Sequence, residues 1–204
     1  THARELISRA PAVLGMGTGG GELFSTILEG YAGFAIATEE WPPNVPIAAQ
    51  RLSLLGTSVV NASGSHLSFS RGSLDLILNS HVDLSPSDVA RVLAPGGRVF
   101  TQQIGRNEWQ EIATFFPRTS REGRVDQFQS YQAGFGNAGL TVTLARSHDT
   151  PEAYRSLGDV LYMFVGVMPQ WRNHRFDLES DLDSLLAMEQ KFAGEKGIVL
   201  TESR

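Results

Sequence analysis

The chain has 204 residues, the length of one ordinary domain rather than two, so we expect a single domain over residues 1–204. Its 41% hydrophobic and 19% charged residues are typical of a globular protein, and no apolar run is long enough to span a membrane. The absence of cysteine excludes disulfides, thiolate nucleophiles and cysteine-containing metal sites. A formal net charge of -5 argues against nucleic acid as a partner, because phosphate backbones favour clustered basic residues. We expect a cytoplasmic protein.

Glycine is over-represented, and its distribution along the chain is uneven. Of the 21 glycines, five fall between positions 15 and 21, directly after the apolar run 12–14. In the segment 23–28 that follows, apolar residues recur at helical intervals, and Gly30 and Gly33 then close it. This order predicts a strand, a glycine-rich loop and a helix.

The same alternation of strand and helix continues to about residue 105. Further strands are predicted at 34–38, 59–62, 74–79 and 98–104, and further helices at 45–55 and 85–93. Strands that alternate with helices are the signature of an α/β fold with a doubly wound, mostly parallel Rossmann-like sheet. We interpret residues 1–105 as the cofactor-binding half of the domain.

Residues 106–204 follow a less regular pattern. We expect helices at 107–115, 125–135, 156–167 and 180–192 and an edge strand at 140–145. We interpret this half as a substrate-binding region with a helical lid. We also expect the last strand of the sheet to begin near residue 201, where the sequence stops.

The glycine-rich loop is the strongest chemical signal in the sequence. Such a loop lets a ligand approach the backbone at the positive end of a helix dipole. Residues 15–20 satisfy the dinucleotide pattern GxGxxG, and Glu39 ends the next strand, where an acid holds ribose hydroxyls. A nicotinamide-dependent oxidoreductase and a glycine-rich turn without a ligand are both compatible with this motif.

Other stretches of the chain favour a different cofactor. They are MGTGGGE at 16–22, HLSF at 66–69, SLDLI at 73–77 and VARVLAPGGR at 89–98. In this order and spacing, the sequence over about residues 10–105 resembles the class I S-adenosylmethionine-dependent methyltransferases, particularly the type 11 group. The family's GxGxG loop maps to residues 15–19, and the acid that closes its second strand maps to Glu39.

The resemblance implies that S-adenosyl-L-methionine is the cofactor. It assigns cofactor contacts to Gly15, Met16, Gly17, Thr18, Gly19, Glu39, Glu40, Ser63, Gly64 and Asn79. Two positions depart from the family's pattern. Gly15 stands where an acid usually ends the first strand, and Ser63, Gly64 and Ser65 are the positions nearest to where an acid often contacts the adenine amino group. We therefore expect weakened affinity for the cofactor.

Methyl transfer from a sulfonium needs correct positioning more than a specialised catalytic motif. A general base helps when the acceptor is a hydroxyl or an ammonium group, and His81, just after the fourth strand, is the candidate base. A histidine that only forms local loop contacts is the alternative. Aromatic side chains either line an acceptor pocket or belong to the core, namely Trp109, Phe115, Phe116 and Trp171. The five histidines show no close pair at ligand spacing, so we expect no metal.

The leading hypothesis is methyl transfer to an oxygen or nitrogen of a small-molecule acceptor. A second is a methyltransferase fold with weakened or lost catalysis that acts as a binding or regulatory partner, and Gly15 motivates it. An NAD(P)-dependent oxidoreductase and an RNA methyltransferase are further alternatives, the latter disfavoured by the net charge. The acceptor and the oligomeric state are left open.

Overall fold

The computed structural model describes residues 2–116, 127–164 and 177–204, and it divides the chain into two compact units. Unit one contains Thr1–Gln103 and Gln129–Ala145, and unit two contains Ile104–Phe128 and Arg146–Arg204. Each unit is described by itself below. The expectation of a single domain over residues 1–204 stays a prediction.

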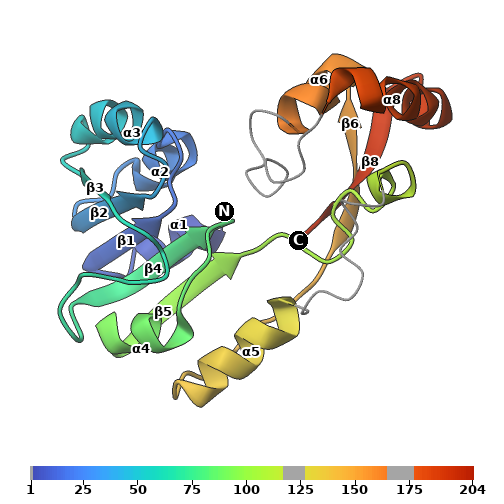
Figure 1. Ribbon diagram of the computed structural model, residues 1–204. Coiled ribbons are helices and arrows are strands. Elements are labelled where there is room, and N and C mark those ends of the chain that lie inside the picture. Colours follow the sequence, from blue (N-terminus) through green and yellow to red (C-terminus); the bar gives the residue numbers. More distant parts are fainter. Residues whose placement is uncertain (1, 117–126, 165–176) are drawn as a thin grey trace. The chain divides into compact units, whose positions relative to one another are not determined.

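Unit one is built on a parallel sheet of five strands in the order β3-β2-β1-β4-β5 (Figure 1). The strands are β1 (Ala12–Met16), β2 (Phe34–Glu39), β3 (Ser58–Asn61), β4 (Leu74–Ser80) and β5 (Leu93–Gln102). All four neighbouring pairs run parallel, and Gly15 of β1 lies opposite Ala37 of β2 and Leu78 of β4. The predicted α/β fold with a mostly parallel sheet is therefore confirmed.

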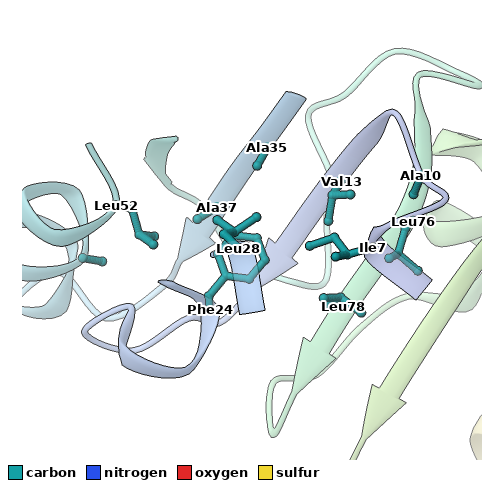
Figure 2. Packing of buried hydrophobic residues seen from close by; sticks show 11 residues of the cluster. Ile7, Ala10, Val13, Phe24, Leu28, Ala35, Ala37, Leu52, Leu76 and Leu78 are labelled. Carbon is teal, nitrogen blue, oxygen red and sulfur yellow. The ribbon is translucent and has the colours of Figure 1, made fainter. Parts of the chain in front are cut away.

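Helices cover both faces of this sheet because successive side chains of each strand point to opposite faces. The helices are α1 (His2–Ile7), α2 (Glu22–Leu28), α3 (Asn44–Ser53), α4 (Pro86–Val92) and α5 (Gln127–Asn137). Val13 of β1 packs in the cluster that contains side chains of α1, α2 and α3, and Figure 2 shows this layer. Leu14, the next residue, packs in the cluster that contains side chains of α4 and α5.

A polar latch fastens the β3–β4 connection to α4. The Asp88 carboxylate accepts hydrogen bonds from Leu67 N and, at 2.7 Å, from Arg91 Nε. Arg91 Nη1 also donates to the Phe69 carbonyl at 2.7 Å. The Ser85 hydroxyl, which accepts from Asp88 N, caps the N-terminus of α4. This latch holds the connection that carries Ser63 and Gly64.

Unit two contains an antiparallel sheet in the order β6-β8-β7. Its elements are β6 (Asp149–Tyr154), β7 (Ala193–Gly194), β8 (Gly197–Ser203), α6 (Leu157–Tyr162), α8 (Leu178–Phe192) and the 3₁₀ turn η1 (Ile112–Thr114). Trp109, Ile112, Leu185 and Met188 are buried together in its core. Trp109 and Phe116 are thus core residues, whereas Trp171 lies outside the described residues.

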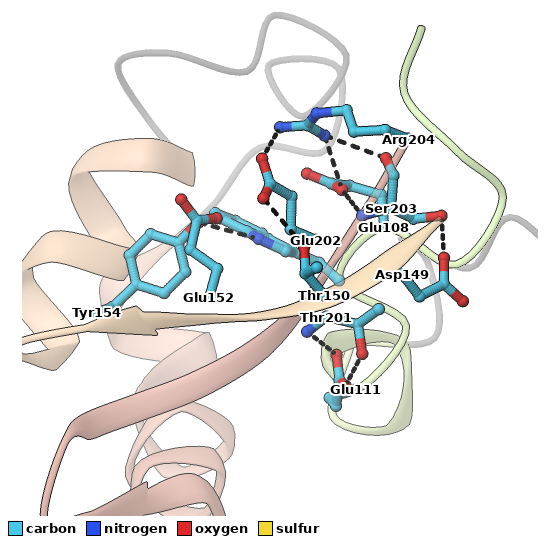
Figure 3. Close-up of polar contacts among 11 residues, drawn as sticks. Glu108, Glu111, Asp149, Thr150, Glu152, Tyr154, Thr201, Glu202, Ser203 and Arg204 are labelled. Atoms are coloured by element: carbon cyan, nitrogen blue, oxygen red, sulfur yellow. Dashed lines mark hydrogen bonds and ion pairs between the residues drawn. The ribbon is translucent and has the colours of Figure 1, made fainter. Parts of the chain in front are cut away.

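A polar network joins β8 to the segment 104–116 of unit two (Figure 3). Glu108 is 4% exposed, and its carboxylate accepts from Ser203 N at 2.6 Å and Arg204 Nη1 at 3.0 Å. The Asp149 carboxylate accepts from the Ser203 hydroxyl at 2.6 Å and from Asn107 Nδ2 at 2.7 Å. The network therefore joins residues about 95 positions apart in sequence.

Two predicted elements are wrong. Residues 107–115 do not form a helix but a series of turns around η1, because Trp109 has a φ of 50° and Asn107 and Glu108 turn to partners on β6 and β8. Residues 140–145 are not a strand. Helix α5 ends with Gly139 at a φ of 84° and Leu140 N bonded to Phe135 O, and the alternating residues that follow pair with no strand among the described residues. The helical lid stays a prediction.

In the described parts of the chain, no helix combines the length and the apolar character needed to cross a membrane. Those same parts hold no group of three histidine, aspartate or glutamate side chains arranged to ligate a metal ion.

The latch makes stability depend on pH. Burial opposes ionisation of Asp88, but the hydrogen bonds from Arg91 and Leu67 and the Arg91 charge outweigh it and lower the pKa of this carboxyl below 3.8. A lowered folded-state pKa stabilises the fold above the unfolded-state pKa, and this contribution is lost as pH falls through the folded-state pKa. We expect the difference in unfolding free energy between wild type and Asp88→Asn, measured with urea, to shrink below about pH 4.

Ser85→Ala is the matched control because it removes the cap of the same helix without removing a titrating group. We expect it to cost about 1 kcal/mol at every pH. A constant difference between wild type and Asp88→Asn across the same range would contradict the assigned role of Asp88.

Candidate functional site

The order of the strands locates the candidate site. The chain order reverses between β1 and β4, which are neighbours in the sheet but are followed by helices on opposite faces. In open parallel sheets, ligands bind outside the carboxyl ends of the strands at such a reversal. Gly17 follows β1 and His81 follows β4 directly at this edge.

The glycine loop takes its shape from left-handed backbone conformations. Gly17, Gly19 and Gly21 have φ angles of 65°, 59° and 83°. Residues with a Cβ adopt such angles only at a cost in conformational energy. Gly17 N and Thr18 N donate to the Thr38 carbonyl at 2.9 and 3.3 Å, and Gly21 N donates to the Thr18 carbonyl at 2.8 Å. The loop thus folds back onto the end of β2, whereas Gly15 and Met16 lie within β1.

Glu39 ends β2 with a buried carboxylate. It is 6% exposed, and its two oxygens accept from Gly19 N at 2.7 Å and from Trp41 N at 2.9 Å. Asn61 of β3 donates to the Glu39 carbonyl at 2.8 Å and so holds the main chain as well. Each carboxylate oxygen has a second lone pair, so Glu39 retains acceptor capacity for a ligand hydroxyl. Glu40, the next residue, is exposed.

Val82 lies between the glycine loop and the loop after β3. A Cβ at Gly17 would overlap Val82 Cγ2, and a Cβ at Gly64 would lie 2.9 Å from Val82 Cγ1 and overlap the Asp83 carbonyl oxygen. Both glycines therefore allow a close approach of backbone and side chain. Loops after β1, β3 and β4 converge here, whereas neighbouring Ser63 hydrogen-bonds Ser65 across 3.0 Å.

Asn79 fixes the loop after β4. This residue is 4% exposed, its Nδ2 donates to the Val82 carbonyl at 3.0 Å, and its Oδ1 accepts from Thr101 and Gln103 at 2.8 and 2.7 Å. Gln103 Nε2 also approaches the Val82 carbonyl at 3.1 Å. The amide of Asn79 thus holds Val82 against the glycine loop.

His81 is exposed and follows β4 with a φ of 60°, which is uncommon for residues other than glycine. Its backbone N donates to the Gln102 carbonyl at 2.9 Å, so β5 fixes the position of its main chain. Two residues on, Asp83 accepts a hydrogen bond from the Tyr131 hydroxyl of α5 at 3.3 Å. Burial and the nearby Asp83 charge raise the pKa of Tyr131, so this phenol stays protonated at neutral pH.

The structure gives a packing reason for glycine at position 15. A Cβ there would lie 2.8 to 2.9 Å from three atoms of the Phe24 ring, which is itself buried against the sheet. Real Cβ atoms do not approach other atoms this closely, so an acid at position 15 requires Phe24 to move. Gly15 and Phe24 are therefore a matched pair.

The donor and acceptor groups fit a ligand with ribose hydroxyls and a polar tail. Glu39 supplies a buried acceptor beside the loop, and Gly17 and Gly64 keep the surrounding loops free of Cβ atoms. The buried Thr18 Oγ1 is without a hydrogen-bond partner among the described residues. Buried polar groups are rarely left in this state.

The sequence did not indicate three residues that shape the site. Val82 and Phe24 are ordinary apolar residues whose roles depend on contacts with distant glycines. Arg51 of α3 donates to the Gly20 carbonyl and pairs with Glu22, and so ties the glycine loop to two helices. Nothing in the sequence distinguishes Arg51, because surface arginines are common on helices.

Comparison with known proteins identifies the class of fold. No protein-family model matches the chain, and no curated protein matches its sequence. Many solved structures do match, and methyltransferases recur among them. The chain therefore has the fold of the class I S-adenosylmethionine-dependent methyltransferases.

Three of these structures cover nearly the whole chain. The YcgJ protein from Bacillus subtilis superposes with a TM-score of 0.64 at 17% identity, over 99% of this chain and 94% of its own. A proposed methyltransferase from Bacillus halodurans gives 0.63 at 14% identity, over 99% and 91%. A proposed sarcosine dimethylglycine methyltransferase from Galdieria sulphuraria gives 0.56 at 13% identity, over 99% and 80%. Identities this low establish the fold alone.

Two glycines of the loop provide a test of the packing against Val82. Gly17→Ala and Gly19→Ala both place alanine at a positive φ, but only the Cβ at position 17 would overlap Val82, and nothing lies within 4 Å of the one at 19. We expect Gly19→Ala to lower the unfolding free energy by about 1 kcal/mol and Gly17→Ala by about 2–4 kcal/mol.

The double variant Gly17→Ala with Val82→Ala removes the overlapping methyl groups, so it should recover part of the excess loss in urea unfolding. Equal losses for the two single variants, or no recovery in the double variant, would show that Val82 does not contact the loop as described.

Proposed function

We propose that the protein is an S-adenosylmethionine-dependent methyltransferase that methylates an oxygen or nitrogen of a small-molecule acceptor. The observation that carries the proposal is the hydrogen bond between Gly19 N and the buried Glu39 carboxylate at the reversal of the sheet. This hydrogen bond holds the left-handed glycine loop against a buried carboxylate, in a fold shared with methyltransferases, and both features support the proposal.

In the proposal, each site residue has a defined task. Glu39 accepts hydrogen bonds from the ribose hydroxyls, and the main chain of Gly17, Thr18 and Gly19 lies against the rest of the cofactor. Gly64 and Ser63 flank the adenine, with Glu40 at the exposed rim. Gly15, Met16 and Asn79 act by position, since they set the ends of β1 and β4 from which the loops start.

S-adenosylmethionine supplies an activated methyl group, so the protein mainly has to hold the acceptor in line for attack. His81 stands at the end of β4, where an acceptor would reach this edge of the sheet, and its exposed imidazole accepts the proton that a hydroxyl or ammonium acceptor releases. Its main chain is held by Gln102, which restricts where the ring can lie.

Cofactor binding is the direct test. Glu39→Gln keeps the shape of the side chain but replaces the carboxylate that accepts hydrogen bonds from the ribose hydroxyls. We therefore expect the Kd for S-adenosylmethionine and for S-adenosylhomocysteine to rise about 10- to 100-fold in calorimetric titrations. Wild type should bind both compounds and should show no saturable enhancement of NADH fluorescence.

Glu40→Gln is the matched control, because its carboxylate is exposed and one residue away. It should change either Kd less than threefold. The absence of heat with wild type at millimolar ligand would refute the proposal, and saturable NADH binding would favour an oxidoreductase instead.

A further inference from the structure

Val82 fills the space between two loops of the candidate site. Its methyl carbon Cγ2 faces Gly17 in the loop after β1, and its methyl carbon Cγ1 faces Gly64 in the loop after β3. A Cβ at Gly17 would overlap Cγ2, so this methyl group is in direct contact with the Gly17 main chain. No ligand atom fits between them. The side chain of Val82 therefore separates the two loops at the edge of the sheet where ligands of this fold class bind.

Polar groups on β4 and β5 hold Val82 in this position. Its carbonyl accepts hydrogen bonds from Asn79 Nδ2 at 3.0 Å and from Gln103 Nε2 at 3.1 Å. The preceding residue is held as well, because His81 N donates to the Gln102 carbonyl at 2.9 Å. We call residues 81–83 the gate loop and these three hydrogen bonds its clamp. The clamp presses the gate loop against the glycine loop.

The clamp also keeps His81 in a strained backbone conformation. Its φ of 60° lies in the left-handed region, which is costly for a residue with a Cβ. Such conformations persist only where the surrounding structure enforces them. When the clamp opens, His81 can return to an ordinary negative φ, and this rotation carries Val82, the next residue, out of the gap. The gate loop therefore has a closed arrangement, held by the clamp, and an open one that is free of this strain.

We propose that the gate loop regulates access to the cofactor site, and that S-adenosylmethionine binds only after Val82 withdraws from Gly17 and Gly64. This inference rests on the proposed function, in which the cofactor lies against Gly17 and beside Gly64. Because only open molecules bind, the apparent affinity is reduced by the fraction of molecules that are open. At high ligand concentration, the opening of the gate loop limits the rate of binding.

Stopped-flow mixing of the whole chain with S-adenosylmethionine tests the gate loop. Tryptophan fluorescence gives the signal, since Trp41 N is hydrogen-bonded to the Glu39 carboxylate beside the site. We expect the observed rate for wild type to reach a plateau as the ligand concentration rises. Val82→Ala removes the two methyl groups that fill the gap, so it should raise the plateau rate and lower the Kd, each about tenfold.

Two further variants separate the gate loop from a general loss of packing. Gln103→Met keeps the length of the side chain but loses the donor to the Val82 carbonyl, so it should change the plateau rate and the Kd in the same direction as Val82→Ala. Val59→Ala is the matched control, because it truncates another half-buried valine of unit one that packs among the side chains of α1, α2 and α3. It should change neither quantity by more than about twofold.

Amide hydrogen exchange without ligand gives an independent measurement. The His81 N–H is bonded to Gln102 only in the closed arrangement. We therefore expect it to exchange about tenfold faster in Val82→Ala than in wild type, and at the wild-type rate in Val59→Ala.

The possible outcomes distinguish the gate loop from the proposed function. A wild-type rate that rises linearly with ligand, or a Val82→Ala variant with unchanged plateau rate, Kd and His81 exchange, would overturn the gate loop alone. Weaker binding by a folded Val82→Ala variant would also overturn it, because Val82 would then contact the ligand instead of closing the site. Wild-type protein that binds neither S-adenosylmethionine nor S-adenosylhomocysteine would overturn the proposed function, and this inference with it.

Discussion

The hydrogen bond between the Glu39 carboxylate and Gly19 N joins the end of β2 to the loop that follows β1, and the geometry of the candidate site depends on it. A buried carboxylate is costly unless it is hydrogen-bonded, and here two backbone N–H groups provide that compensation. The adjacent Thr38 carbonyl accepts from Gly17 N and Thr18 N, so two consecutive residues of β2 fix the path of the whole loop. Glu39 therefore shapes the loop and still has lone pairs left for a ligand.

The sequence predicts most of unit one because its signals are local. Apolar runs and glycine stops predict the strands β1 to β5 and the helices α2 to α4, although not α1, and Glu39 could be found because an acid that ends a strand is visible in the sequence. Val82 could not be found in this way. Its importance depends on Gly17 and Gly64 lying close to it, which is a tertiary fact.

Unit two shows how long-range contacts override a local pattern. Residues 107–115 have helical periodicity, yet the Trp109 φ of 50° ends any helix there. The backbone turns because buried Glu108 bonds Ser203 and Arg204, which are about 95 residues away in sequence. Leaving a buried carboxylate unpaired costs more than a short helix contributes, so the ion pair decides the conformation. A pocket of unit two lies beside this network. Both polar and apolar side chains line it, among them Glu111, Asp149 and Leu200.

Glycine has two separate roles in β1 and the loop after it. The distinction explains why position 15 holds glycine and not the acid expected from the methyltransferase pattern. Gly17, Gly19 and Gly21 are required by positive φ angles, whereas Gly15 lies in a regular strand and is required by the Phe24 ring. An acid at position 15 would add charge for a ligand, but it would also have to be desolvated against a buried apolar layer. Phe24 instead strengthens the packing between α2 and the sheet. With glycine at position 15, the chain lacks one charged group at the end of β1 but packs Phe24 tightly against the sheet. The loop and Glu39 are unaffected by this difference.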